Sequence, residues 1–381
     1  MPGIRTSRLA FRNASGSLEH FWPLLPHEFL IRSKLDRVFK FLEMGIRHDA
    51  AAAVVDDNKY IPFAVATDLI PYAYAGLIKS IMALGYKPNQ NFWVFPYDWR
   101  QSNRLSGQLL SRFIEKVSMG DGNPDGVDIV SHSMGGIITR TAQKYGAPIK
   151  RTVFIGCPHT GSPLAYFILH PEIDSRRFIG SAYDTYSADA TLIGKDTGTD
   201  EPKHTLYRRR KELFAKFPSM YELLPDELYL RKQPILYADG KPAFGVEATY
   251  LEGDWAFKDE NMRAAVRDAV TFKAEIGSKL QGECLSICGT NHVTFDSIRY
   301  KAAYHTSVAE RRPSYVMQRG FSLPYDSGLG GDGYVPIESA MAAPLVSEAN
   351  KPQNSVFLSE SHTTLPNARA TAEAIARFLS M

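Results

Sequence analysis

Residues 130–136 read Val130-Ser131-His132-Ser133-Met134-Gly135-Gly136. A short run rich in β-branched residues, 126–129, precedes this stretch, and residues 137–145 after it have the pattern of a helix that Gly146 ends. A strand, a tight turn with a serine among small residues, and a helix together predict a nucleophile elbow. We therefore expect Ser133 to be a nucleophile at a helix N-terminus, where free backbone N–H groups favour a developing oxyanion.

The elbow departs from the usual pattern at one position. Ser131 stands where glycine is common, because neighbouring elements approach this turn so closely that side chains two residues away must be tiny. Gly135 meets this demand on the other side, and we expect serine, a small polar residue, to be tolerated. A serine among small residues also arises by chance, so the flanking strand and helix patterns carry the prediction.

Strand-like and helix-like segments alternate along much of the chain. Apolar residues at helical spacing predict helices, and short apolar runs bounded by turn residues predict strands. The predicted segments are helices 72–84, 104–117 and 367–379 and strands 91–95, 149–156, 284–289 and 356–358. This alternation predicts an α/β fold with a mostly parallel sheet and helices on both faces.

The alternation fails after Pro163 and resumes near residue 283. The intervening segment carries charged and aromatic helices and a loop rich in Gly, Thr and Asp. We interpret residues 164–282 as a helical cap inserted into a core made of residues 1–163 and 283–381. Together with the elbow, this organisation resembles the α/β-hydrolase fold.

A serine hydroxyl needs a base to become a nucleophile, and the base needs an orienting carboxylate. Among the ten histidines, His362 follows the predicted last strand and precedes the last helix, which is the position of the base in this fold. His132 is adjacent to Ser133 and cannot fold back onto it, and His159 precedes the cap. We therefore predict that His362 is the base.

Asp332 is the predicted acid because it stands in a glycine-rich turn, residues 330–336, before the last strand. In this fold the order along the chain is serine, acid, histidine, which Asp332 satisfies. Asp326 and Asp296 also precede His362 and remain competitors in less constrained settings.

Bulk composition excludes several classes of function. The net charge of +3 comes from 44 basic and 41 acidic residues without a long basic face, so we expect no nucleic-acid partner. Three cysteines without a C-x-x-C pair give no indication of a metal or redox site, and we expect no cofactor. The first residues lack an apolar signal region, and no stretch approaches ~18 apolar residues, so we expect a cytoplasmic protein.

Two stretches near the N-terminus have alternative interpretations. Residues 21–31 are strongly apolar but interrupted by proline, and either pack in the core or contact a lipid surface. Residues 12–19 form a loop of small residues after a strand candidate at 8–11. This is either an ordinary loop or the loop that supplies a second oxyanion N–H.

Several motifs occur together in a characteristic order: Tyr97-Asp98-Trp99-Arg100, the elbow, and residues 156–163, 218–225 and 331–336. In these motifs the chain, from about Leu9 onward, resembles the lecithin:cholesterol acyltransferase-like family of lipases. Tyr97–Arg100 is the most specific piece, because the elbow is shared across the whole superfamily. We interpret Asp98 and Arg100 as a structural pair, with substrate contact as the alternative.

The resemblance implies a triad of Ser133, Asp332 and His362, which agrees with the residues reasoned above. It implies oxyanion donors at the N–H of Met134 and in the first loop, which we place at Ala14. The family usually carries Pro-Gly in that loop, whereas Arg12-Asn13 precede Ala14 here.

We therefore predict a serine esterase, either a lipase or phospholipase or an acyltransferase, that works through an acyl-enzyme intermediate. Its expected partner is a lipid or other acyl ester, with peripheral membrane contact as an additional expectation. A hydrolase of non-lipid esters or macrolide-type lactones is the second candidate, since a fold does not fix the substrate. A catalytically silent binding protein is the third.

Overall fold

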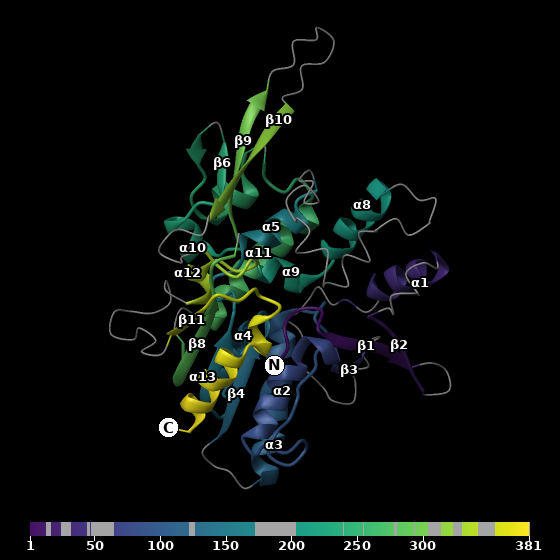
Figure 1. Ribbon diagram of the computed structural model, residues 1–381. Helices are drawn as coiled ribbons and strands as arrows, with labels where there is room; N and C mark the ends of the chain where they lie inside the picture. Colours follow the sequence, from purple (N-terminus) through teal and green to yellow (C-terminus); the bar gives the residue numbers. More distant parts are fainter. Residues whose placement is uncertain are drawn as a thin grey trace. The chain divides into compact units, whose positions relative to one another are not determined.

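The computed structural model describes residues 1–12, 17–23, 32–43, 46, 65–121, 126–171, 203–238, 240–253, 255–277, 280–292, 294–303, 314–322, 330–341 and 355–380. These residues form two compact units. The first contains residues 1–151 and 166–221, and the second contains residues 152–165 and 222–381. Figure 1 shows the chain and labels elements of both units where there is room.

The first unit carries the N-terminal strands and the elbow. Its elements are β1 (Ser7–Arg12), β2 (Leu18–Trp22), α1 (Arg32–Glu43), β3 (Val65–Leu69), α2 (Pro71–Ala83), α3 (Asn103–Asp121), β4 (Val127–His132), α4 (Gly135–Lys144) and α8 (Lys203–Phe214). Three elements cross the boundary between the units, namely β5 (Ile149–Ile155), α5 (Pro163–Leu169) and α9 (Pro218–Glu222).

The second unit carries the remaining strands and the C-terminal helix. Its elements are α10 (Glu227–Lys232), β6 (Leu236–Ala238), β7 (Lys241–Pro242), the π-helix η4 (Glu247–Leu251), α11 (Glu260–Ile276), β8 (Glu283–Gly289), β9 (Thr294–Ala303), β10 (Ser314–Ser322), α12 (Ile337–Ala340), β11 (Ser355–Leu358), the 3₁₀ helix η7 (Leu365–Asn367) and α13 (Arg369–Leu379). None of the helices in the described ranges is both long and apolar enough to span a bilayer.

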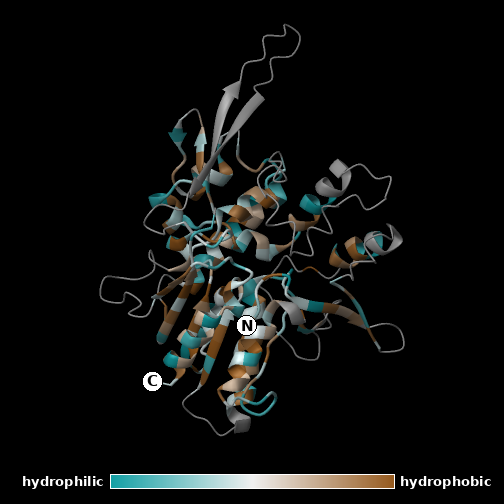
Figure 2. Ribbon diagram, viewed as in Figure 1, coloured by the Kyte–Doolittle hydropathy of each residue, from teal (hydrophilic) through white to brown (hydrophobic). Residues whose placement is uncertain are grey.

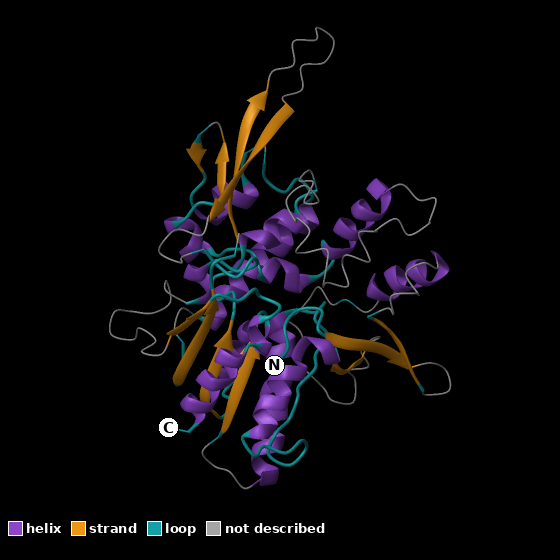
Figure 3. Cartoon of the chain, in the orientation of Figure 1, coloured by secondary structure: helices purple, strands orange, loops and turns teal. Residues whose placement is uncertain are grey.

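The central sheet has the strand order β11-β8-β5-β4. Figure 3 draws the strands in orange and the helices in purple. Strands β11 and β8 run parallel, with Ser355 opposite Ser286. Leu285 and Ile287 of β8 are buried, and hydrophobic stretches, brown in Figure 2, lie along the strands of this sheet. Along the chain, β4 is followed by α4, β5 by α5 and β11 by α13. The predicted α/β class is therefore confirmed.

A second sheet, of order β2-β1-β3, is antiparallel and packs the aromatic residues of the N-terminal stretch. Trp22 is 1% exposed, its indole Nε1–H donates to the carbonyl of Arg5 (3.0 Å), and its ring lies 5.3 Å from that of Trp99. Phe21 is also buried. The apolar stretch is therefore core at these two residues, and residues 24–31 lie outside the described part of the chain.

The Asp98–Arg100 pair holds the end of α1. Arg100 is fully buried and donates from Nε and Nη2 to the two carboxylate oxygens of Asp98, at 2.9 and 2.7 Å. Its Nη1 donates to the carbonyls of Phe41 and Leu42. A buried guanidinium requires partners for all its donors, and these contacts are structural, as the sequence indicated.

One predicted strand is wrong. Residues 91–95 form no strand, because the backbone around them makes a local turn instead of a ladder. Phe92 N donates to the Lys87 carbonyl (3.2 Å), Asn89 N donates to the Phe92 carbonyl (2.9 Å), and the Asn91 side chain accepts from Lys87 N (2.6 Å). Apolar content alone did not distinguish this turn from a strand.

A third sheet, β10-β9-β6-β7, was not predicted. Strand β9 pairs antiparallel with β10 and parallel with β6, where Leu236 lies opposite Ile298. A strand within the predicted cap thus shares a sheet with a hairpin that follows β8 in the chain. The cap boundaries, 164 and 282, stay predictions.

Candidate active site

Ser133 lies at the turn between β4 and α4 and has a left-handed backbone, with φ of 54°. Positive φ is costly for a residue with a side chain and is found mainly at functional turns. A run of small residues allows the chain to turn this sharply, and the helix that begins at Gly135 follows directly. This is the backbone geometry that a nucleophile elbow requires.

At the start of α4, the backbone N–H of Met134 can donate a hydrogen bond to an anion. In the described part of the chain, Met134 N donates no hydrogen bond, whereas Gly136 N donates to the Ser133 carbonyl at 3.0 Å. Unsatisfied N–H groups at a helix start bind anions. The role of Met134 N–H as an oxyanion donor stays a prediction.

The hydroxyl of Ser131 has a partner, which explains why serine fits where glycine is usual. Ser131 Oγ lies 2.7 Å from Thr139 Oγ1, and Thr139 Oγ1 donates to the Gly135 carbonyl at 2.9 Å. Because Thr139 has one proton to donate, Ser131 donates to Thr139. The buried hydroxyl therefore carries no desolvation penalty from an unmet hydrogen bond.

A segment that the sequence interpretation overlooked, Met1–Ile4, packs against the elbow. Met1 N donates to the Val130 carbonyl (2.8 Å), and His132 N donates to the Met1 carbonyl (3.1 Å), as in paired strands. A Cβ added to Gly3 would lie 2.9 Å from Ser133 Cβ, so only glycine fits. The sequence did contain a signal for an oxyanion role of this segment, namely Pro2-Gly3, since the resembled family carries Pro-Gly in its oxyanion loop.

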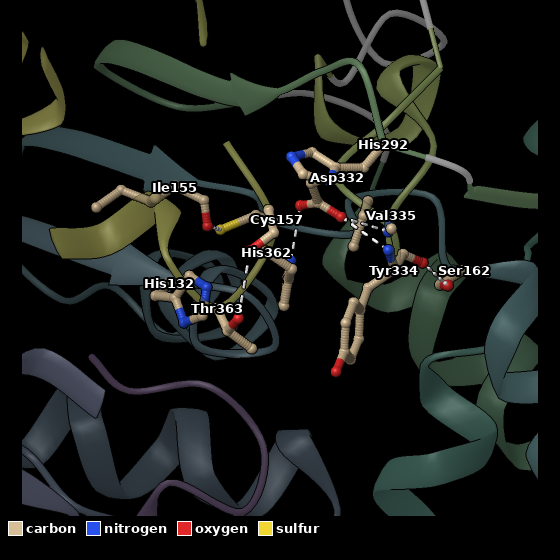
Figure 4. Close-up of polar contacts among 12 residues, drawn as sticks. His132, Ile155, Cys157, Ser162, His292, Asp332, Tyr334, Val335, His362 and Thr363 are labelled. Carbon is tan, nitrogen blue, oxygen red and sulfur yellow. Dashed lines mark hydrogen bonds and ion pairs between the residues drawn. The ribbon is translucent and has the colours of Figure 1, made fainter. Parts of the chain in front are cut away.

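In the second unit, Asp332 and His362 form a buried pair (Figure 4). His362 Nδ1 lies 2.7 Å from Asp332 Oδ2, and their side chains are 8% and 1% exposed. The backbone reinforces the pairing, because His362 N donates to the Asp332 carbonyl at 2.8 Å. A carboxylate on Nδ1 fixes the proton there and leaves Nε2 to act as a base.

The other carboxylate oxygen of Asp332 holds the glycine-rich turn. Oδ1 accepts from Tyr334 N at 3.0 Å and from Val335 N at 2.8 Å (Figure 4). Both oxygens are therefore fixed, which orients Oδ2 toward His362. Of the two competing acids, Asp296 lies in β9 and accepts from Ser297 Oγ, and Asp326 lies outside the described residues.

Gly156, at the end of β5, leaves the space that this pair occupies. A Cβ there would lie 2.9 Å from Asp332 Oδ2 and 3.2 Å from His362 Nδ1. Its φ of 53° also disfavours any other residue. A glycine at the end of the predicted strand 149–156 was thus a further sign of the site in the sequence.

The ring of Tyr334 stacks on the imidazole of His362, with ring centroids 4.9 Å apart and an angle of 16° between the planes. The backbone of Tyr334 is held by a hydrogen bond, because Ser162 Oγ donates to the Tyr334 carbonyl at 2.5 Å. The stacked ring limits rotation of the imidazole and presents an electron-rich face to it. The sequence interpretation assigned no role to Tyr334.

Cys288, at the end of β8, is not a competing nucleophile. Burial, together with the charge of Asp332, raises the pKa of the Cys288 thiol to about 12. Since the thiolate is the reactive form, this thiol is inert near neutral pH.

The predicted site residues are distributed over both units. Ser133 and Met134 belong to the first, Asp332 and His362 belong to the second, and Ala14 lies outside the described residues. The two histidines set aside as bases have other neighbours: His132 Nδ1 lies 2.8 Å from the Tyr74 hydroxyl, and His159 packs edge-on against Phe154.

Comparison with known proteins supports the resemblance seen in the motifs. The family model described as lecithin:cholesterol acyltransferase matches residues 60–171. Phospholipase A(1) LCAT3 from Arabidopsis thaliana is 22% identical over an alignment of 363 residues that covers 87% of this chain and 74% of that protein. Lecithin-cholesterol acyltransferase-like 4 from the same plant is 28% identical over 102 residues, 24% of this chain and 18% of that protein.

A chain in the crystal structure of the Tle4–Tli4 complex matches the fold, with a TM-score of 0.58 and 16% identity over 99% of this chain and 96% of that one. The resemblance to the lecithin:cholesterol acyltransferase-like family is therefore confirmed, as is the α/β-hydrolase fold. The chain is an ester-acting enzyme that resembles this family.

Proposed function

We propose that the chain cleaves acyl esters of lipids through a triad of Ser133, Asp332 and His362 and an acyl-enzyme intermediate. The observation that carries the proposal is the buried contact between His362 Nδ1 and Asp332 Oδ2, at 2.7 Å. This contact holds the imidazole so that Nε2 can accept a proton. A serine hydroxyl in a strained elbow is the kind of nucleophile that such a base activates.

In the proposed reaction, Ser133 Oγ attacks the acyl carbonyl while His362 Nε2 takes the hydroxyl proton. Asp332 holds the Nδ1 proton and stabilises the imidazolium. The tetrahedral intermediate then breaks its bond to the leaving alcohol, which receives the proton from His362. Water or a second alcohol attacks the acyl-serine by the same steps in reverse, which gives a free acid or a new ester.

For the oxyanion we propose two backbone donors, the N–H of Met134 and that of Ile4, in place of Ala14. Ile4 follows Gly3, whose Cα packs against Ser133, and in the described part of the chain Ile4 N has no acceptor. Ile4→Pro removes this donor and should lower kcat by ~10²–10³-fold, as loss of one oxyanion donor does. Ile4→Ala keeps the N–H and should retain activity. If Ala14→Pro is the damaging change instead, the donor is in the loop after β1.

Lipid esters are the proposed substrates because the relatives are named as a phospholipase and an acyltransferase-like protein. We further propose that the enzyme acts in the cytoplasm in peripheral contact with lipid surfaces. The hydrolase of non-lipid esters or lactones remains the second candidate, since the elbow and the Asp332–His362 pair would serve either substrate equally.

The test is product analysis on phosphatidylcholine vesicles with the wild type and Ser133→Ala. Mass spectrometry should find free fatty acid and lysolipid with the wild type alone, and a new ester when a long-chain alcohol is added. Turnover limited to short soluble esters or lactones would favour the second candidate. No turnover of any ester would favour a binding protein.

A further inference from the structure

The hydroxyl of Tyr74 lies at the centre of a buried network beside the elbow. Tyr74 is on α2 and is 3% exposed. Its hydroxyl oxygen accepts from Gly3 N at 2.7 Å and lies 2.8 Å from His132 Nδ1 and 3.2 Å from Thr6 Oγ1. One side chain thus joins the N-terminal loop to the residue before Ser133.

The protons in this network can be assigned from its donors. Gly3 N can only donate, so the Tyr74 oxygen accepts there. Thr6 Oγ1 donates its one proton to the Gly3 carbonyl at 2.6 Å. Of the two remaining contacts of the Tyr74 hydroxyl, that with His132 Nδ1 is shorter than that with Thr6 Oγ1. Both peptide groups of Gly3 are thus held by side chains.

These contacts determine where the Ile4 N–H points. The Gly3 carbonyl and the Ile4 N–H belong to one planar peptide group and point in opposite directions. Holding the carbonyl on Thr6 therefore fixes the direction of the Ile4 N–H. Glycine has the greatest backbone freedom of all residues, so without these contacts this peptide could rotate.

We propose that Tyr74 and Thr6 are positioning residues that hold the Gly3–Ile4 peptide in the orientation of an oxyanion donor. This inference rests on the proposed function, and specifically on Ile4 N–H as the second donor. Neither side chain touches the substrate. Each acts through the backbone of Gly3, so its loss should weaken stabilisation of the transition state more than substrate binding.

The experiment compares an ester with its thiono analogue, in which sulfur replaces the carbonyl oxygen. Sulfur is a weak hydrogen-bond acceptor, so the oxo-to-thiono ratio of kcat/KM reports how well the oxyanion donors are aligned. Tyr74→Phe and Thr6→Val should each lower kcat for the oxo ester by about 10-fold. This loss is smaller than that from removing an oxyanion donor completely, because the N–H is still present but is held less firmly. KM should change less than about two-fold, and the ratio should fall with kcat.

Two matched variants separate positioning from general damage. Thr6→Ser keeps the hydroxyl and should keep the ratio. Tyr221→Phe removes the hydrogen bond from another buried tyrosine to a backbone carbonyl, that of Ala215 at 2.8 Å, and should leave the ratio unchanged. The double variant Tyr74→Phe/Thr6→Val should fall short of the product of the single effects, because both side chains hold the same residue.

The outcomes distinguish this inference from the proposed function. If the wild type shows no preference for the oxo ester, the oxyanion assignment fails and the inference fails with it. If the wild type shows the preference and both folded variants keep it, only the role of Tyr74 and Thr6 is overturned. Should Tyr74→Phe not fold, the Thr6→Val and Thr6→Ser pair decides the question alone.

Discussion

The elbow and the Asp332–His362 pair are held in place by different means. At the elbow, the position of Ser133 is set by the backbone, through a left-handed φ of 54° and a glycine packed against its Cβ. At the pair, side chains do the positioning, since each oxygen of Asp332 is bound and Tyr334 stacks on the imidazole.

This difference predicts how each region responds to substitution. A group positioned by the backbone tolerates small side-chain changes nearby and fails when volume is added. A group positioned by hydrogen bonds fails when one atom of the network is exchanged. The predictions below test this contrast, beginning with removal of the reacting groups themselves.

Removing a reacting group should have the largest effect. Ser133→Ala and His362→Ala should each lower kcat by ~10⁴–10⁶-fold, and the double variant should be little worse, because the two residues work as one unit. Steady-state kinetics on a soluble ester measures all three. If the loss of kcat in the double variant equals the product of the two single losses, the residues do not share a mechanism.

Asp332→Asn should lower kcat by ~10³–10⁴-fold, because it imposes the wrong imidazole tautomer. Tyr334 N and Val335 N both donate to Oδ1, so the amide oxygen of asparagine would take that position and its NH₂ would face His362. The imidazole would then carry its proton on Nε2, where it cannot accept one from serine. Asp296→Asn is the control, and greater damage there would assign the acid to Asp296.

Tyr334→Leu should lower kcat by about 3- to 10-fold, in line with an aromatic contact to a developing cation. Tyr334→Phe keeps the stacked ring, 4.9 Å from the imidazole, and should stay within about two-fold of the wild type. Kinetics of the two variants side by side makes the comparison. Equal losses of kcat in the two variants would assign the effect to the Tyr334 hydroxyl and would exclude a role for the stacked ring.

The smallest effect is expected at Ser131. Ser131→Gly restores the usual elbow pattern and should keep activity within a few-fold, at a cost of about 1 kcal/mol for the hydrogen bond to Thr139. Ser131→Leu should lower the free energy of unfolding by about 1–3 kcal/mol through overpacking. Denaturant titration checks both, and a leucine variant as stable as the wild type would show that the turn is not closely packed.

The elbow and the α/β class were predictable because their determinants are local. The strand, the small residues around Ser133 and the helix lie within about twenty consecutive positions of the sequence. The strand prediction for residues 91–95 failed although the determinants there are also local. The apolar residues resemble a strand, and apolar content does not reveal the hydrogen bonds of the turn at residues 87–92. Phe21 and Trp22 had two interpretations until their burial was known.

The contacts around the candidate site depend on long-range packing that the sequence pattern does not encode. Gly3 and Ser133 are 130 positions apart, and apart from the Pro2-Gly3 pair that the resembled family carries in its oxyanion loop, no local pattern indicates that the elbow is their neighbour. The same holds for Tyr334 and His362, which are separated by the strand β11. The pairing of Asp332 with His362 was nevertheless predictable, because chain order in this fold restricts where an acid and a base can occur.

The central claim is that Ser133 is the nucleophile activated by the Asp332–His362 pair. It is tested most directly by treating the protein with a fluorophosphonate and mapping the adduct by peptide mass spectrometry. The account predicts one adduct, on Ser133, formed quickly in the wild type and at least about 10³-fold more slowly in His362→Ala. An adduct on another residue, or the same labelling rate in both proteins, would contradict it.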